Sequence, residues 1–183
     1  AMHVGIPAIP ISPAYSLMSN DFGRLKFISE LVTPGLVFAQ DGARFSSALS
    51  ALLPGDAEIV VSENPPDGID VNFFDALVSG TAKGAVDEAF SKVGPDTVAK
   101  ILFTSGSTGQ PKGVINTQRM LCSNQVAMSQ VWTFLNDRPP ITLDWLPWNH
   151  TFGGNHNLNM MLRNGGTMYV DAGKPAPGLI EQT

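Results

Sequence analysis

The residues best suited to chemistry lie in one short loop, residues 104–113, between two apolar runs. Glycines let the backbone turn so that successive N–H groups point at one anion. Hydroxyls add hydrogen-bond donors, and a lysine adds a mobile positive charge. The loop has hydroxyls at Thr104, Ser105, Ser107 and Thr108, glycines at Gly106 and Gly109, and an ammonium group at Lys112. This composition predicts a loop that binds phosphate.

Two other interpretations of the loop are weaker. Its spacing differs from the P-loop of nucleoside triphosphatases, in which four residues separate a glycine from a Gly-Lys pair. A flexible Ser/Gly linker has a similar composition. However, apolar runs at 101–103 and 114–115 flank this loop, and it holds one proline and one lysine at fixed positions. These features favour a phosphate-binding loop over a linker.

A histidine further along the chain is the second candidate. His150 lies among aromatic residues and glycines, and such a histidine is more often a packed side chain than a functional one. Trp145 and Trp148 precede it, and their flat apolar surfaces suit an aromatic substrate. His156 is too far along to share a helical face with His150 and has no acid nearby, so no metal site is predicted. Three asparagines are expected to satisfy backbone groups at the start of the next helix: Asn155, Asn157 and Asn159.

The elements that must position these residues alternate along the chain. Apolar runs bounded by Gly, Pro, Asp or Asn predict strands at 36–39, 59–61, 98–104, 141–145 and 167–170. Helices are predicted at about 21–33, 45–53, 73–79, 86–92 and 117–135. Continuous apolar strands that alternate with helices are typical of a parallel sheet covered on both faces. The predicted fold class is therefore α/β, with a mainly parallel sheet flanked by helices.

The longest predicted helix, 117–135, has a recognisable start and an apolar face. Asn116 or Thr117 is suited to cap its N-terminus. Cys122 lies within it and is expected to be a small core residue. Apolar residues recur at helical spacing and predict one buried face, made of Leu121, Met128, Val131, Trp132 and Leu135.

Composition excludes several classes of protein. Of 183 residues, 43% are hydrophobic and 15% charged, which excludes intrinsic disorder, and the net charge of −5 excludes a polybasic nucleic-acid binder. No apolar run reaches the roughly 18–20 residues that cross a membrane. The single cysteine excludes an internal disulfide and a cysteine-based metal cluster. We expect a soluble, cytoplasmic globular protein with an unusually apolar surface, whose anion site lies in the less acidic second half.

Both ends of the sequence resemble the interior of a larger domain. The start lacks the basic and apolar regions of a signal peptide, and residues 4–10 predict the exit of a buried strand. The chain stops in the apolar stretch 178–183 without a polar tail. We interpret residues 1–183 as an internal fragment.

The loop at 104–113 resembles, over ten unbroken residues, the phosphate-binding motif of the adenylate-forming (AMP-binding) superfamily. Residues 5–16 resemble an early segment of that family, and residues 144–154 resemble a later motif that places a histidine beside the carboxylate substrate. Residues 164–167 and 171–175 are most similar to feruloyl-CoA synthase-type aryl-CoA ligases. The resemblance covers most of the chain and implies that 1–183 comes from the large N-terminal domain, without the mobile C-terminal domain.

This resemblance implies a ligase that uses ATP, Mg²⁺ and CoA. A carboxylic acid, ferulate-like and aromatic, attacks the α-phosphate of ATP to give an acyl-adenylate, and the thiol of CoA then displaces AMP. Thr104, Ser105, Ser107, Thr108 and Lys112 would hold the β- and γ-phosphates, with Gly106 and Gly109 in the same binding loop, and His150 would line or gate the acyl pocket. The family's Mg²⁺ and CoA sites have no match within 1–183, so the fragment alone is expected to be inactive.

Other functions stay open at this point. Within the family, the chain fits a fatty-acyl or other acid:CoA ligase, or an adenylating enzyme that loads a carrier protein. Outside catalysis, it fits a nucleotide-binding module that has lost its activity. The expected partners are a small carboxylic acid, ATP and CoA, with no nucleic acid and no membrane span.

Overall fold

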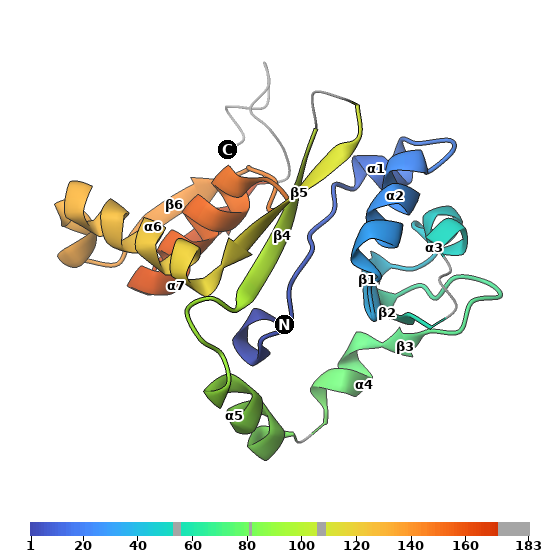
Figure 1. The fold of residues 1–183 in the computed structure, drawn as a ribbon, viewed down its shortest axis with the longest axis horizontal. Coiled ribbons are helices and arrows are strands. Elements are labelled where there is room, and N and C mark those ends of the chain that lie inside the picture. The colour runs from blue at the N-terminus through green and yellow to red at the C-terminus, as the bar shows by residue number, and fades with distance from the viewer. Residues whose placement is uncertain (53–55, 81, 106–108, 172–183) are drawn as a thin grey trace. The chain divides into compact units, whose positions relative to one another are not determined.

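The computed structural model describes residues 1–52, 56–80, 82–105 and 109–171. The chain divides into two compact units, which Figure 1 shows together with their elements. The first, here the hairpin unit, comprises Ala1–Ile11, Val86–Ser107 and Lys112–Thr183. The second, here the three-strand unit, comprises Ser12–Ala85 and Thr108–Pro111. Each is described by itself below.

The three-strand unit is a small parallel sheet with helices. Strands β1 (Leu36–Asp41), β2 (Glu58–Glu63) and β3 (Asn72–Phe73) pair in that order, with Val37 opposite Ile59 and Val61 opposite Phe73. Its helices are α1 (Ala14–Leu17), α2 (Gly23–Val32), α3 (Ser46–Leu52) and α4 (Phe74–Val78). Parallel neighbours need a crossover connection, and α3 supplies it between β1 and β2.

The core of this unit lies between its central strand and α3. Ala39, Leu49, Ile59 and Val61 form one buried cluster. Val61 is fully buried, and burial of a valine side chain of this kind contributes about 1.5–3 kcal/mol to folding. The apolar run of β2 is therefore buried on both faces, as expected for a central parallel strand.

The hairpin unit is built around β4 (Val98–Ser105) and β5 (Pro111–Thr117), which are neighbours in a two-stranded sheet. Only five residues join them, too few for a parallel crossover, so the pair is an antiparallel hairpin (Figure 1). Lys100 of β4 also forms an isolated parallel bridge with Ala8. The phosphate-binding loop predicted from the sequence is the connection of this hairpin.

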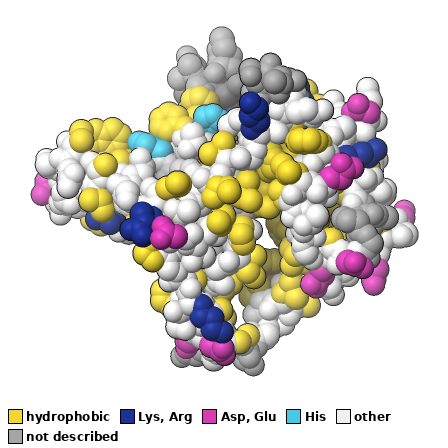
Figure 2. All heavy atoms as spheres, viewed as in Figure 1, with side chains coloured by type: hydrophobic (Ala, Val, Ile, Leu, Met, Phe, Trp, Pro, Cys, Tyr) yellow, Lys and Arg dark blue, Asp and Glu magenta, His cyan; other side chains and the backbone are white. Residues whose placement is uncertain are grey.

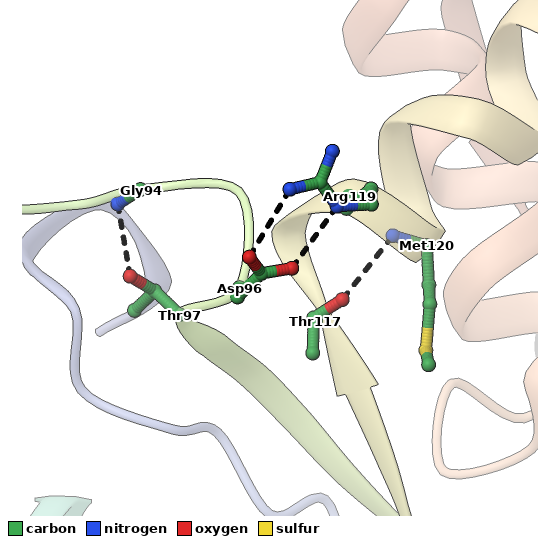
Figure 3. Close-up of polar contacts among 6 residues, drawn as sticks. All are labelled: Gly94, Asp96, Thr97, Thr117, Arg119 and Met120. Carbon is green, nitrogen blue, oxygen red and sulfur yellow. Dashed lines mark hydrogen bonds and ion pairs between the residues drawn. The ribbon is translucent and has the colours of Figure 1, made fainter.

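Helix α6 (Gln118–Val131) follows β5 directly and is anchored at its first turn (Figure 3). The Thr117 hydroxyl caps the helix by accepting a hydrogen bond from the Met120 N–H at 3.4 Å. Arg119 makes two bonds of 3.0 and 3.1 Å to the Asp96 carboxylate. This ion pair lowers the pKa of Asp96 and raises that of Arg119 through hydrogen bonding and charge. The cap predicted at Asn116 or Thr117 is confirmed at Thr117.

A parallel strand pair completes the hairpin unit. Strands β6 (Ile141–Asp144) and β7 (Thr167–Val170) pair with Ile141 opposite Thr167, and a π-helix (Phe152–Asn157) and α7 (Leu158–Asn164) connect them. The remaining helices are 3₁₀ turns at Met2–Val4 and Thr133–Asn136, and α5 (Lys83–Ser91), which spans the boundary between the units. The core here is a methionine-rich cluster of Met128, Leu135, Met160 and Met161.

The predicted α/β class with mainly parallel pairing and flanking helices is confirmed, and three local predictions are wrong. The helix expected over 117–135 breaks at Trp132, whose ψ of 73° is not helical, and Val131 before it is 78% exposed. Cys122 is exposed rather than in the core. Residues 4–10 form no strand, since a 3₁₀ turn and the single bridge at Ala8 occupy that segment.

Large apolar side chains remain on the surface, as expected from the composition. Figure 2 shows hydrophobic side chains spread over the visible face. The exposed ones include several on β6 and β7, namely Ile141, Leu143, Tyr169 and Val170. Among the described residues, none of the helices combines the length and apolar character that a membrane crossing requires.

Candidate functional site

The predicted phosphate-binding residues lie at the end of the β4–β5 hairpin. Ser105 is the last residue of β4, and Lys112 is the second of β5. Thr104 and Lys112 are exposed, so their donors are accessible to a ligand. Gly109 has φ +85°, a conformation that glycine adopts without strain. Three further predicted residues, Gly106, Ser107 and Thr108, lie outside the described residues.

The third glycine of the loop sequence has a packing role that sequence reasoning did not find. A side chain at Gly113 would place its Cβ 3.1 Å from Cγ2 of Ile101 and 3.3 Å from the ring of Phe103. Both neighbours belong to β4, the opposite strand of the hairpin. Gly113 therefore lets these two apolar side chains cover β5 and hold the two ends of the loop together.

A pocket of about 370 Å³ lies beside the hairpin, within the hairpin unit. Helix α6 forms one wall of the pocket, and the start of the π-helix forms another. Asn116 of β5 also lines it. None of the described residues that line it carries a charged Asp, Glu, Lys or Arg side chain. The lining residues are Asn116, Met120, Leu121, Asn124, Thr151, Phe152, Asn155 and His156. The volume is within the range of small-molecule sites, and the lining suits an uncharged, partly polar group.

Amide side chains join the walls of this pocket. The Asn155 Nδ2 group donates to Asn116 Oδ1 at 2.9 Å and to Thr151 Oγ1 at 3.2 Å. Gln125, which is buried in α6, donates from Nε2 to the Asn155 backbone oxygen at 3.2 Å. Asn155, one of the three asparagines predicted to satisfy backbone groups, instead links β5 to the π-helix through its side chain.

The π-helix depends on two glycines at its start. A Cβ at Gly153 would lie 2.7 Å from the Pro147 backbone oxygen, and one at Gly154 would overlap the Trp148 backbone oxygen. Real Cβ atoms do not come this close to a carbonyl oxygen. Both glycines are buried, so the segment 147–148 can pack directly on the helix backbone only because no side chain intervenes.

His150 lies just before the π-helix and is exposed. Its Nδ1 atom accepts a hydrogen bond from the Phe152 N–H at 3.3 Å, and its backbone oxygen accepts from the Gly154 N–H at 2.8 Å. The residues that line the pocket include His156 but not His150. The functional role of His150 stays a prediction, and His156 is a pocket residue that sequence reasoning assigned no role.

A buried lysine connects the hairpin to the π-helix. Lys100 in β4 is only 4% exposed, and its Nζ donates to the Gly154 backbone oxygen at 2.6 Å. Burial lowers the pKa of Lys100, because a charged ammonium is poorly solvated inside the protein. The contact joins residues 54 positions apart, and the position of Lys100 in an apolar run does not indicate its partner, so the sequence does not predict this contact.

Comparison with known proteins finds a CoA ligase and a carboxylic acid reductase among the relatives of this chain. A propanoyl:CoA ligase of Rhodococcus jostii, whose acyl group carries a methyl-dioxo-octahydroindenyl ring system, is 33% identical over 119 residues, covering 62% of this chain and 21% of the ligase. A carboxylic acid reductase of Mycobacterium marinum is 31% identical over 143 residues, covering 78% of this chain and 11% of the reductase. The chain thus spans about a tenth to a fifth of these relatives.

A solved structure shows the same fold. The structure of a malonyl-CoA ligase in a ternary product complex, with methylmalonyl-CoA and AMP bound, superposes with a TM-score of 0.67. The superposition covers all of this chain and 33% of the ligase chain, and the two sequences are 22% identical. The fold likeness holds along the chain, and the family model of the AMP-binding enzymes matches residues 1–182. The chain therefore belongs to the AMP-binding enzyme family.

Proposed function

We propose that this chain supplies the phosphate-binding loop and part of the acid pocket of an ATP-dependent acid:CoA ligase. The reaction joins a carboxylate to the α-phosphate of ATP with release of pyrophosphate, and the thiol of CoA then displaces AMP from the acyl-adenylate. The observation that carries the proposal is the ten-residue loop 104–113 at the end of the β4–β5 hairpin, in a chain of the AMP-binding family.

The loop residues are suited to polyanion binding. The hydroxyl of Thr104 and the ammonium of Lys112 are donors at the two strand ends, and Gly109, which lies between them in the sequence, has a positive φ. Hydrogen-bond donors and positive charge at such a site stabilise the charge that develops on the leaving pyrophosphate during adenylation. The full set assigned to the β- and γ-phosphates is Thr104, Ser105, Gly106, Ser107, Thr108, Gly109 and Lys112.

The pocket beside α6 is the proposed site for the organic part of the acid. Met120, Leu121 and Phe152 offer apolar surface, and asparagine, threonine and histidine side chains supply a few polar groups. Such a lining fits an aromatic ring that carries polar substituents, and we propose a ferulate-like acid. His150, next to this pocket in the sequence, is proposed to lie beside the carboxylate.

The other reactants would bind largely outside this chain. In the described part of the chain, no group of three or more His, Cys, Asp or Glu side chains is placed to hold a metal ion. Following the resemblance to the family, we propose that the Mg²⁺ that accompanies ATP, and the CoA, bind to other parts of the complete enzyme. The proposed location of the enzyme is the cytoplasm.

Carboxylate-dependent exchange of pyrophosphate into ATP tests this proposal directly. The assay uses the full-length product of the source gene with ferulate, benzoate and a medium-chain fatty acid in parallel. Exchange that is fastest with ferulate supports both adenylation and the aromatic assignment. Faster exchange with the fatty acid keeps the reaction and rejects the aromatic acid, and no exchange with any acid favours a nucleotide-binding module without activity.

The acyl acceptor requires a second measurement. After exchange is established, CoA and the phosphopantetheine arm of a carrier protein are offered separately, and the thioester product is quantified. Thioester formation on free CoA supports the ligase assignment. A product found only on the carrier protein would replace it with a carrier-loading enzyme.

A further inference from the structure

A chain of three side chains ends at the pocket. Asp144, at the end of β6, is 2% exposed, and its Oδ1 atom accepts hydrogen bonds from Asn157 Nδ2 at 3.0 Å and from the Leu146 N–H at 3.1 Å. Asn157 in turn contacts Nδ1 of His156 through its Oδ1 atom at 2.7 Å. The order from the core outward is therefore Asp144, Asn157, His156.

This order determines which nitrogen of His156 carries the proton. The amide group of Asn157 faces Asp144 with its NH₂, which donates to Asp144 Oδ1. The amide oxygen then faces His156, and that oxygen only accepts. Nδ1 must therefore be the donor, and in the neutral ring Nε2 is left with a lone pair.

Aromatic contacts hold the ring in this orientation. The His156 ring meets Phe152 edge to face, with centroids 5.0 Å apart and an interplanar angle of 77°. It meets Trp132 similarly, at 5.6 Å and 78°. His156 also lines the pocket, and among the described residues no protein group donates a hydrogen bond to its Nε2. Nε2 of His156 is therefore a hydrogen-bond acceptor without a described protein donor, on a ring that lines the pocket and is held in place.

We propose that His156 determines substrate specificity by accepting, at Nε2, a hydrogen bond from a hydroxyl group on the ring of the acid. The inference rests on the proposed function for the identity of the pocket's ligand. Asp144 and Asn157 are positioning residues, because they act only through the imidazole. A ligand hydroxyl is the complementary group, since it donates a proton, is neutral like the pocket lining, and belongs to phenolic acids.

The test compares two acids that differ only in this hydroxyl. The full-length gene product is titrated with 4-coumarate and with cinnamate by calorimetry, and pyrophosphate exchange is measured with the same pair. The wild-type protein is expected to bind 4-coumarate on the order of tenfold more tightly, the usual effect of one satisfied hydrogen bond in a buried site. The same ratio is expected in kcat/KM.

Three variants separate hydrogen bonding from packing. His156→Phe keeps a flat ring without an acceptor and is expected to remove the preference for 4-coumarate while cinnamate binds about as before. His156→Gln retains an acceptor and is expected to keep part of the preference, which also covers the case in which the phenylalanine variant does not fold. The matched control is His3→Phe, because His3 stacks on Phe90 and is not among the residues that line the pocket, so its loss should leave the ratio unchanged.

The outcomes distinguish the inference from the proposed function. A hydroxyl preference that disappears in His156→Phe supports the inference, even if no acid supports exchange and the ligase assignment falls. Equal weakening of both acids in His156→Phe, with exchange intact in the wild type, overturns the inference and leaves the ligase assignment standing. Equal binding of the two acids by the wild-type protein, or binding of neither, also overturns it.

Discussion

The hairpin loop and the pocket differ in how their residues are brought together. The proposed phosphate-binding residues lie within nine consecutive positions, and two adjoining strands are enough to present them. The pocket draws its lining from Asn116 at the end of β5 through to His156 in the π-helix, and a side-chain bond between Asn155 and Asn116 joins them across 39 positions. The first site is local and its key cation is exposed, whereas the second depends on close backbone packing and buried polar groups. Substitutions should therefore affect chemistry alone in the loop, and chemistry together with stability at the pocket.

The largest effect on activity is expected from Lys112→Ala in the full-length enzyme. Loss of one positive donor to the β- and γ-phosphates, which leave as pyrophosphate, should slow adenylation on the order of a hundredfold to a thousandfold. Because Lys112 is exposed, the free energy of unfolding should change little. Pyrophosphate exchange measures the first step, and thioester formation from supplied acyl-adenylate measures the second. Equal losses in both steps would contradict the assigned role.

Gly154→Ala should damage the pocket through the fold. The added methyl group meets the Trp148 backbone oxygen, and relief of that overlap requires the π-helix to move. We expect a loss of about 1–3 kcal/mol in unfolding free energy, measured by urea denaturation, together with weaker acid binding. Gly94→Ala is the matched control, since a Cβ there has no neighbour within 4 Å. Similar losses in both variants would show that the close contact is not the cause.

Lys100→Met should reveal a pH dependence specific to the buried lysine. Folding lowers the pKa of Lys100, so between that lowered value and the ordinary 10.5 the unfolded chain binds more protons than the folded one. Wild-type stability should therefore rise relative to the methionine variant as pH increases through this window. Denaturation of both proteins at several pH values measures the difference. The control is Lys92→Met, which removes an exposed lysine that pairs with Glu88 and leaves the buried Lys100 in place.

The smallest effect is expected from Asp96→Asn at the start of α6. The pair with Arg119 lowers the pKa of Asp96, so its stabilisation is present above the ordinary carboxyl pKa of 3.8 and disappears as the pH falls below the lowered value. Both partners are exposed, and salt should weaken the pair further. Melting temperatures in low and high salt measure this. A difference from wild type that persists unchanged in acid or in high salt would rule out the ion pair as its source.

Sequence patterns predicted most of the local structure. The strand at 167–170 agrees residue for residue with β7, and the Thr117 cap sets the start of α6. The end of α6 was missed because Trp132 continues the apolar spacing, while its backbone leaves the helix to let the next 3₁₀ turn bury Leu135. Cys122 was misplaced because a small apolar residue in a helix carries no sign of which face it occupies.

The loop at 104–113 is recognisable from the sequence alone because everything that defines it, glycines, hydroxyls and one lysine in order, is local. The tertiary structure alone decided that Lys100 bonds to Gly154, that two glycines admit the backbone of 147–148, and that His156 rather than His150 lines the pocket. These contacts join residues that are distant in sequence or depend on the direction of one side chain. No pattern of residue types records such contacts, because burial and hydrogen-bond geometry arise only when the elements pack.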